Sequence, residues 1–119
     1  MSQEFTEQEL HNMAMNVVGE DLEKRGFEFM SVNSQLKKDP QFVCLKDKKL
    51  HFVVVKAVLY PQNPETYNVT YMETVKEHAL KFEARTYYAG VGIANAKNYE
   101  SPVVKGEKYI VNYNGIIEI

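Results

Sequence analysis

A lysine stands inside the longest apolar stretch of this chain. Residues 50–59 read LHFVVVKAVL, so Lys56 follows three consecutive valines. Its aliphatic stem can lie along such a strand while its ammonium reaches water at the strand end. A buried ammonium would instead need a carboxylate partner, and Asp21 is our candidate because it falls near the middle of the apolar face expected for residues 7–25. The second interpretation predicts a structural ion pair between Lys56 and Asp21.

The first helix is signalled at both ends. Thr6 and Glu9 have the spacing of a capping box, and apolar residues then recur at helical intervals as far as Leu22. Gly26 stands where a left-handed residue ends a helix. We therefore expect a helix over residues 7–25 with one face in the core.

Strand patterns follow this helix. A loop that contains two prolines and two asparagines comes after the third strand, and Thr70 and Glu73 then predict the start of a second helix, which ends near Arg85. Both faces of the third strand are apolar, which is typical of a central strand covered on both sides. The predicted strands of this part are residues 27–32, 41–46, 50–59 and 86–95.

The end of the chain carries a hairpin signal. The segments KYIVNY and IIEI flank Asn114 and Gly115, and Asn-Gly between alternating apolar residues is typical of a tight hairpin turn. We expect a C-terminal β-hairpin over residues 108–119. Because a late hairpin leaves an exposed sheet edge, and tyrosines such as Tyr109 are enriched at interfaces, we expect a protein partner or a second copy of this chain as the binding partner.

Composition bounds the class of protein. A chain of 119 residues, with 45% hydrophobic and 25% charged residues, predicts a single domain over residues 1–119. The net charge is −2, and Arg25 and Arg85 are the two arginines, so nucleic-acid binding is not favoured. The N-terminal segment lacks the pattern of a signal peptide, and no apolar run approaches the roughly 20 residues of a membrane span. We expect a cytoplasmic protein without a membrane segment.

Other candidate groups have simpler explanations. Cys44 is the single cysteine and lies in an alternating apolar run, so we expect a small buried hydrophobe. The three histidines lack metal-site spacing, and His51 on a strand is expected in the core or at an edge. Gly90 and Gly92 lie inside a strand pattern and are expected to permit close packing of a helix or a bulge, rather than to form a dinucleotide loop. The histidines are His11, His51 and His78.

The order of elements resembles a known superfamily. The order αβββαβ, the long apolar third strand with its lysine, and the passage ARTYYAGVGIAN from Ala84 to Asn95 are similar to the PD-(D/E)XK nuclease superfamily. Within it, the chain resembles the Holliday-junction-resolvase-like branch of archaea and bacteria. This resemblance implies an α/β fold, with a restriction-endonuclease-like αβββαβ core and a mixed central sheet, to which the C-terminal β-hairpin is added.

The resemblance also implies what has been lost. In the superfamily a proline and an aspartate open the second strand, and an acid, one intervening residue and a lysine lie on the third. Pro40 and Lys56 match, whereas Gln41 stands at the aspartate and Val54 at the strand acid. Two carboxylates are needed to hold a divalent cation that activates water. The resemblance therefore implies vestigial site residues, Gln41, Val54 and Lys56, and a non-catalytic structural or interaction module without a cofactor.

Two alternatives remain. Asp39 lies two residues from the missing acid, and Glu77 on the predicted second helix could reach toward the strand of Lys56. Relocated acids of this kind, which occur in the resembled superfamily, would give a metal-dependent DNA nuclease with Mg²⁺ or Mn²⁺. The other alternative is a small-ligand pocket where the substrate of an ancestral nuclease lay, which requires an apolar cavity.

Overall fold

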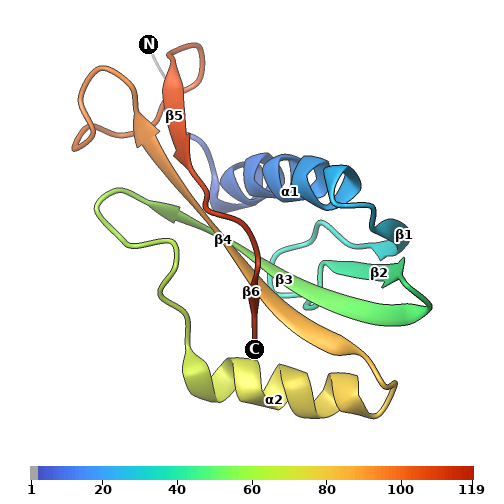
Figure 1. Ribbon diagram of the computed structural model, residues 1–119. Helices are drawn as coiled ribbons and strands as arrows, with labels where there is room; N and C mark the ends of the chain where they lie inside the picture. Colours follow the sequence, from blue (N-terminus) through green and yellow to red (C-terminus); the bar gives the residue numbers. More distant parts are fainter. Residues whose placement is uncertain (1–2) are drawn as a thin grey trace.

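The strands within residues 3–119, which the computed structural model describes, form one mixed sheet with a helix on each face (Figure 1). The elements are α1 (Glu7–Lys24), β1 (Glu28–Val32), β2 (Phe42–Lys46), β3 (Lys49–Leu59), α2 (Val69–Leu80), β4 (Arg85–Asn95), β5 (Tyr109–Asn112) and β6 (Ile117–Glu118). The strand order is β1-β2-β3-β4-β5, and β6 also pairs with β4. Because β3 and β4 are parallel and the other pairs antiparallel, the predicted α/β class with a mixed central sheet and αβββαβ order is confirmed.

Helix α1 has the caps that the sequence predicts. The Thr6 hydroxyl accepts a hydrogen bond from the Glu9 N–H at 3.1 Å, and the Glu9 carboxylate accepts one from the Thr6 N–H at 2.9 Å. At the other end Arg25 is the C-cap, and Gly26 has φ +88°, which a residue without Cβ adopts at little cost. The capping box and the glycine stop are confirmed, and the helix ends one residue earlier than predicted.

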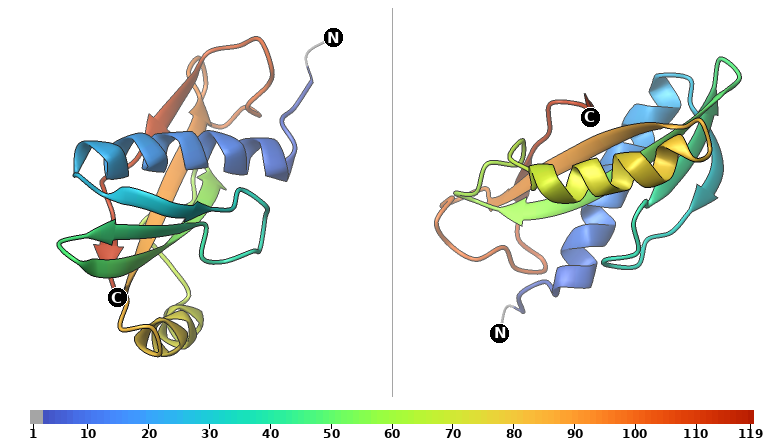
Figure 2. Two further views of the ribbon diagram at one scale, coloured as in Figure 1. Left: turned by 90° about the vertical axis from the view of Figure 1, so that its right-hand side faces the viewer. Right: turned by 90° about the horizontal axis from the view of Figure 1, so that it is seen from below.

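Strand β3 is covered on both faces, as its apolar pattern predicts. Val53 and Val55 pack in one cluster with α1 residues such as Leu22. Phe52 and Val54 point to the opposite face, where they pack with residues of α2 and β4. Figure 2 shows α1 and α2 on opposite sides of the sheet. Burial on both faces makes β3 the rigid element on which a site can be built.

Two glycines let the β3–α2 loop lie directly on β4. A Cβ at Gly90 would lie 1.7 Å from the Pro64 carbonyl oxygen, and one at Gly92 would lie 3.3 Å from the Pro64 ring. The Tyr88 hydroxyl donates to the same carbonyl at 2.8 Å. The expected close packing at these glycines is confirmed, but the partner is this loop and not a helix.

Helix α2 begins and ends earlier than predicted. Its N-cap is Asn68, whose side chain accepts a backbone N–H of the first turn at 2.9 Å, and not Thr70. Three successive i to i−3 hydrogen bonds then tighten the chain, so the helix ends at Leu80 instead of near Arg85. As a result Phe82 lies beyond the end of the helix and is 53% exposed.

The C-terminal segment is not a hairpin, and that prediction is wrong. β5 and β6 both run antiparallel to β4, where β5 lies along Gly92–Asn95 and β6 along Tyr87–Tyr88. Tyr113 and Ile116, between the two strands, pack against the core cluster that includes α1. An isolated two-stranded hairpin is marginally stable, whereas pairing with β4 supplies a third strand and buries the apolar side chains. The local Asn-Gly signal is therefore overridden by the open edge of β4.

Two expectations about single residues are confirmed. Cys44 is buried, and burial raises the pKa of its thiol to about 11, so it behaves as a small hydrophobe. His51 is also buried, and its Nδ1 lies 3.1 Å from the Tyr87 hydroxyl. Neither α1 nor α2 has the length and apolar character that crossing a membrane requires.

Candidate functional site

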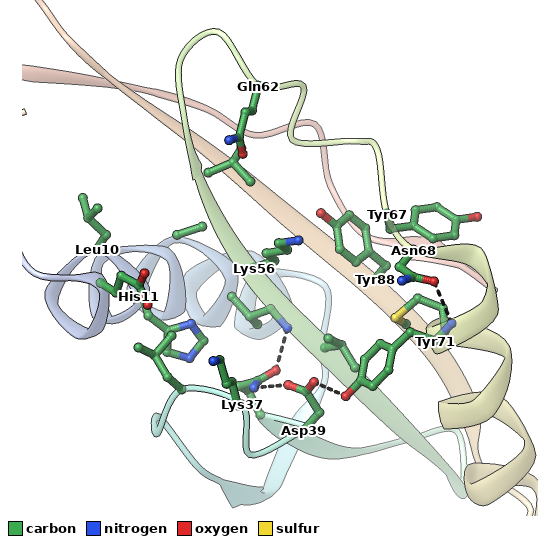
Figure 3. A pocket seen from close by; sticks show the side chains of 18 of the residues that line it. Leu10, His11, Lys37, Asp39, Lys56, Gln62, Tyr67, Asn68, Tyr71 and Tyr88 are labelled. Carbon is green, nitrogen blue, oxygen red and sulfur yellow. Dashed lines mark hydrogen bonds between the residues drawn. The ribbon is translucent and has the colours of Figure 1, made fainter. Parts of the chain in front are cut away.

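A cavity of about 520 Å³ opens beside β3, on the part of the sheet that α2 does not cover (Figure 3). Its walls come from α1, the β1–β2 loop, β3, the β3–α2 loop, the start of α2 and β4. All three of the vestigial positions, Gln41, Val54 and Lys56, line it, and so does Asp39. The resemblance therefore points to the same region as the cavity.

Gln41 is built into the sheet. Gln41 is 1% exposed, and its Oε1 accepts a hydrogen bond from the Val55 N–H at 2.7 Å. Its backbone N–H donates to the Val53 carbonyl, so the side chain extends the β2–β3 ladder by one more bond. The amide at this position thus has a structural role that explains its burial.

Asp39 is held by two donors. Its Oδ1 accepts a hydrogen bond from Gln41 Nε2, and its Oδ2 accepts one from the Tyr71 hydroxyl. Partial burial, together with the neighbouring carboxylate, raises the pKa of Tyr71 to about 12, so the hydroxyl keeps the proton that it donates. A continuous chain of hydrogen bonds therefore links the backbone of β3 to the first turn of α2 through Asp39 (Figure 3).

Val54 and Lys56 lie on the same face of β3 in different surroundings. Val54 is 5% exposed and packs with Met72 and Tyr88, whereas Lys56 is exposed. The predicted ion pair of Lys56 with Asp21 is wrong. Lys56 forms no ion pair with any residue in the described range 3–119, and it is the interpretation in which the ammonium reaches water that agrees with the structure.

Asp21 has other partners, on the opposite face of the sheet. Arg25 Nε donates to Asp21 Oδ1 at 2.9 Å, and the Tyr113 hydroxyl donates to Asp21 Oδ2 at 2.5 Å. A helical projection shows which face a carboxylate is on, but not which neighbouring segment covers that face. The C-terminal segment covers it here, because it pairs with β4 instead of folding on itself.

The relocated acids are only partly brought together. Asp39 and Lys56 share the cavity, but Glu77 does not line it and is exposed on α2. No group of three or more His, Cys, Asp or Glu side chains within residues 3–119 is placed to hold a metal ion. Of the two relocated acids, the structure therefore brings only Asp39 to the cavity that Lys56 lines.

Sequence reasoning missed the role of His11. This residue is 2% exposed and lines the cavity, and its Nε2 is buried without a hydrogen-bond partner among residues 3–119. Burial lowers the pKa of His11, and the negative charge of Asp39 partly opposes this effect. The signal was present in the sequence, since His11 precedes Ala14 and Val18 at helical spacing on the buried face of α1.

The part of the chain that forms the cavity matches a protein-family model. The family model described as a domain of unknown function, DUF8840, matches residues 8–119. The chain belongs to the DUF8840 family. Comparisons with curated proteins and with solved structures found no match. The DUF8840 region contains every residue that lines the cavity except Glu7.

Proposed function

We propose that this protein is a cytoplasmic, non-catalytic binding module on a nuclease-like fold. The observation that carries the proposal is the use of the motif positions for packing and hydrogen bonding. Gln41 joins the β3 backbone to Asp39, and Val54 packs under Met72. Neither side chain is available for the chemistry of a nuclease, although both stand where the resembled superfamily has its acids.

The remaining oxygens support the same proposal. A hard divalent cation is held by several oxygen ligands, among them carboxylate oxygens. Both oxygens of Asp39 already accept hydrogen bonds, and the Gln41 Oε1 accepts the Val55 N–H. These hydrogen bonds fix the orientation of the oxygens and compete with a cation for their lone pairs. We therefore expect no metal-dependent cleavage.

A cleavage assay tests the proposal. Wild-type protein and the Lys56→Ala variant are incubated with single-stranded, duplex and four-way-junction DNA in the presence of Mn²⁺. We expect no cleavage by either protein, with the fold of each checked by circular dichroism. Cleavage by the wild type that is lost in Lys56→Ala would overturn the proposal.

The second candidate function is a metal-dependent DNA nuclease that uses Asp39, Glu77 and Lys56. The observation in its favour is that Asp39 and Lys56 line the same cavity. In this case Tyr71→Phe should strengthen Mn²⁺ binding, because it frees one oxygen of Asp39, and Asp39→Asn should abolish it. Paramagnetic broadening of amide signals by Mn²⁺ measures the binding directly. Under the non-catalytic proposal, no variant shows site-specific broadening.

We also propose self-association or protein binding through the edge of the sheet. β5 is an edge strand, and Tyr109, Ile110 and Val111 are 44%, 39% and 40% exposed. An apolar edge with unpaired backbone groups favours pairing with another strand. Light scattering should show a dimer for the wild type and a monomer for Ile110→Lys. A wild-type monomer at all concentrations would exclude the second copy and leave another protein as the partner.

A further inference from the structure

The charged groups of the cavity differ in whether they are already satisfied. Both oxygens of Asp39 accept hydrogen bonds within the protein. Lys37 and Lys56 line the same cavity, and neither forms an ion pair with any residue in the part of the chain that the structure describes. Glu7 and Asp39 are the competing carboxylates. Glu7 lies in the first turn of α1, where the helix dipole stabilises a negative charge, and Asp39 is held by two donors of the protein. The two ammonium groups are thus the charges that a ligand can neutralise.

The walls between these charges are largely apolar. Leu36 and Val58 lie on the lining, and Tyr71 and Met72 bring the first turn of α2 to it. The volume of about 520 Å³ falls in the range of sites for small molecules, which runs from about 300 to 1,000 Å³. An apolar or aromatic body is therefore the part of a ligand that these walls would bury.

His11 is an independent indication that the ligand of the cavity carries a polar group. Its Nε2 is buried and has no hydrogen-bond partner in the described part of the chain, whereas most buried polar atoms in proteins are hydrogen-bonded. Figure 3 shows His11 and Lys37 among the side chains that line the cavity. A neutral imidazole offers one donor and one acceptor. Because Nε2 itself is covered, a small rotation of the ring must accompany a hydrogen bond from His11 to a ligand in the cavity.

We propose that the cavity binds a small organic anion with an apolar body. Lys56 on β3 and Lys37 on the β1–β2 loop neutralise the anionic group, the wall near Tyr71 covers the body, and His11 accepts or donates one hydrogen bond. This inference specifies the ligand of the proposed non-catalytic module and rests on that proposal.

Three matched probes test the charge preference. Fluoronaphthoate, fluoronaphthamide and fluoronaphthamidine share one aromatic body and differ in charge, and fluorine NMR titration gives their affinities. We expect the carboxylate to bind about tenfold more tightly than the amide, and the amidine to bind least. Binding of the carboxylate should also shift the ring nitrogens of His11. Equal affinities, or no binding at about 5 mM carboxylate, would overturn the inference.

Variants test which lysines act. Lys56→Gln and Lys37→Gln should each weaken the carboxylate about fivefold and leave the amide unchanged. Lys48→Gln is the matched control, because Lys48 is an exposed lysine of the β2–β3 turn that does not line the cavity. Loss of carboxylate affinity in the control alone, or in none of the variants, contradicts the assignment.

Two further ligands distinguish the binding of a small organic anion from the binding of free phosphate or of nucleic acid. If inorganic phosphate binds as tightly as fluoronaphthoate, the cavity does not recognise the apolar body. If duplex DNA displaces fluoronaphthoate, the ligand of the cavity is a nucleic-acid backbone and not a small organic anion. Both results overturn the inference. If the protein cleaves DNA and also binds fluoronaphthoate, only the non-catalytic proposal is overturned. If it neither cleaves DNA nor binds fluoronaphthoate, only the anion site is overturned.

Discussion

Tyr113 and Asp21, which are 92 positions apart in the chain, are joined by a hydrogen bond of 2.5 Å from the hydroxyl to Oδ2. Arg25 holds the same carboxylate with its Nε at 2.9 and 3.0 Å from the two oxygens. Burial and the carboxylate raise the pKa of Tyr113, so the hydroxyl stays protonated and remains a donor. The bond fastens the segment between β5 and β6 to α1.

This bond predicts the effect of Tyr113→Phe. Removing a hydrogen bond to a charged group lowers the free energy of unfolding by about 1.5–3 kcal/mol, measured by urea denaturation. Tyr109→Phe is the control, because Tyr109 is 44% exposed.

Lys56→Met should stay within about 0.5 kcal/mol of the wild type, since the ammonium is in water. Destabilisation by Lys56→Met equal to that by Tyr113→Phe would contradict this view of Asp21.

Gln41 predicts a large loss of stability in the core of the site. Gln41→Leu leaves the Val55 N–H and one oxygen of Asp39 without their partner, so we expect the free energy of unfolding to fall by about 2–4 kcal/mol. Gln35→Leu, which changes an exposed glutamine, should have an effect below about 0.5 kcal/mol. A Gln41→Leu variant as stable as the wild type would show that the amide is not structural.

Gly90 and Gly19 predict opposite effects of the same substitution. A methyl group at Gly90 meets the Pro64 carbonyl oxygen at 1.7 Å, so Gly90→Ala must displace the β3–α2 loop and should cost about 2–4 kcal/mol. At Gly19, inside α1, the nearest atom is 3.5 Å away, and alanine favours the helix by about 0.5–1 kcal/mol. Thermal unfolding should therefore give a lower Tm for the first variant and a higher Tm for the second, and equal values would contradict the loop contact.

His11 predicts a dependence of stability on pH. Because burial lowers its pKa in the folded protein below the ordinary value near 6.5, the unfolded chain binds a proton first as the pH falls. The free energy of unfolding should therefore decrease from pH 7 downward through that window, by at most about 1.4 kcal/mol per pH unit for this one group. This share of the slope should be missing in His11→Leu and kept in His78→Gln, which removes an exposed histidine. The same slope in all three proteins would contradict the prediction.

The parts of the fold that local sequence determines were predicted well. Each cap of α1 is formed by residues within four positions of the helix end. The long apolar runs of β3 and β4 are compatible with few structures other than buried strands. Where two local signals competed, the prediction was wrong. Asn68 and Thr70 are both good N-cap residues, and the chain uses the first.

Long-range pairing could not be read from the sequence. The Asn-Gly turn signal is valid for an isolated segment, but it does not account for the open edge of β4, where pairing buries more surface. The same limit applies to the site. Tyr71 and Asp39 are 32 residues apart, and nothing in their local sequences indicates that they meet. Gln41 and Lys56 do line one cavity, because the predicted strands 41–46 and 50–59 pair side by side in the sheet.

Strand β4 is incomplete while the chain is being synthesised. It obtains its second row of partners from β5 and β6, which leave the ribosome after it. Until then one edge of a buried, apolar strand has amide and carbonyl groups without intrachain partners, and such edges pair with other nascent chains. The protein therefore depends on dilution or a chaperone to avoid aggregation until β5 and β6 have paired with β4.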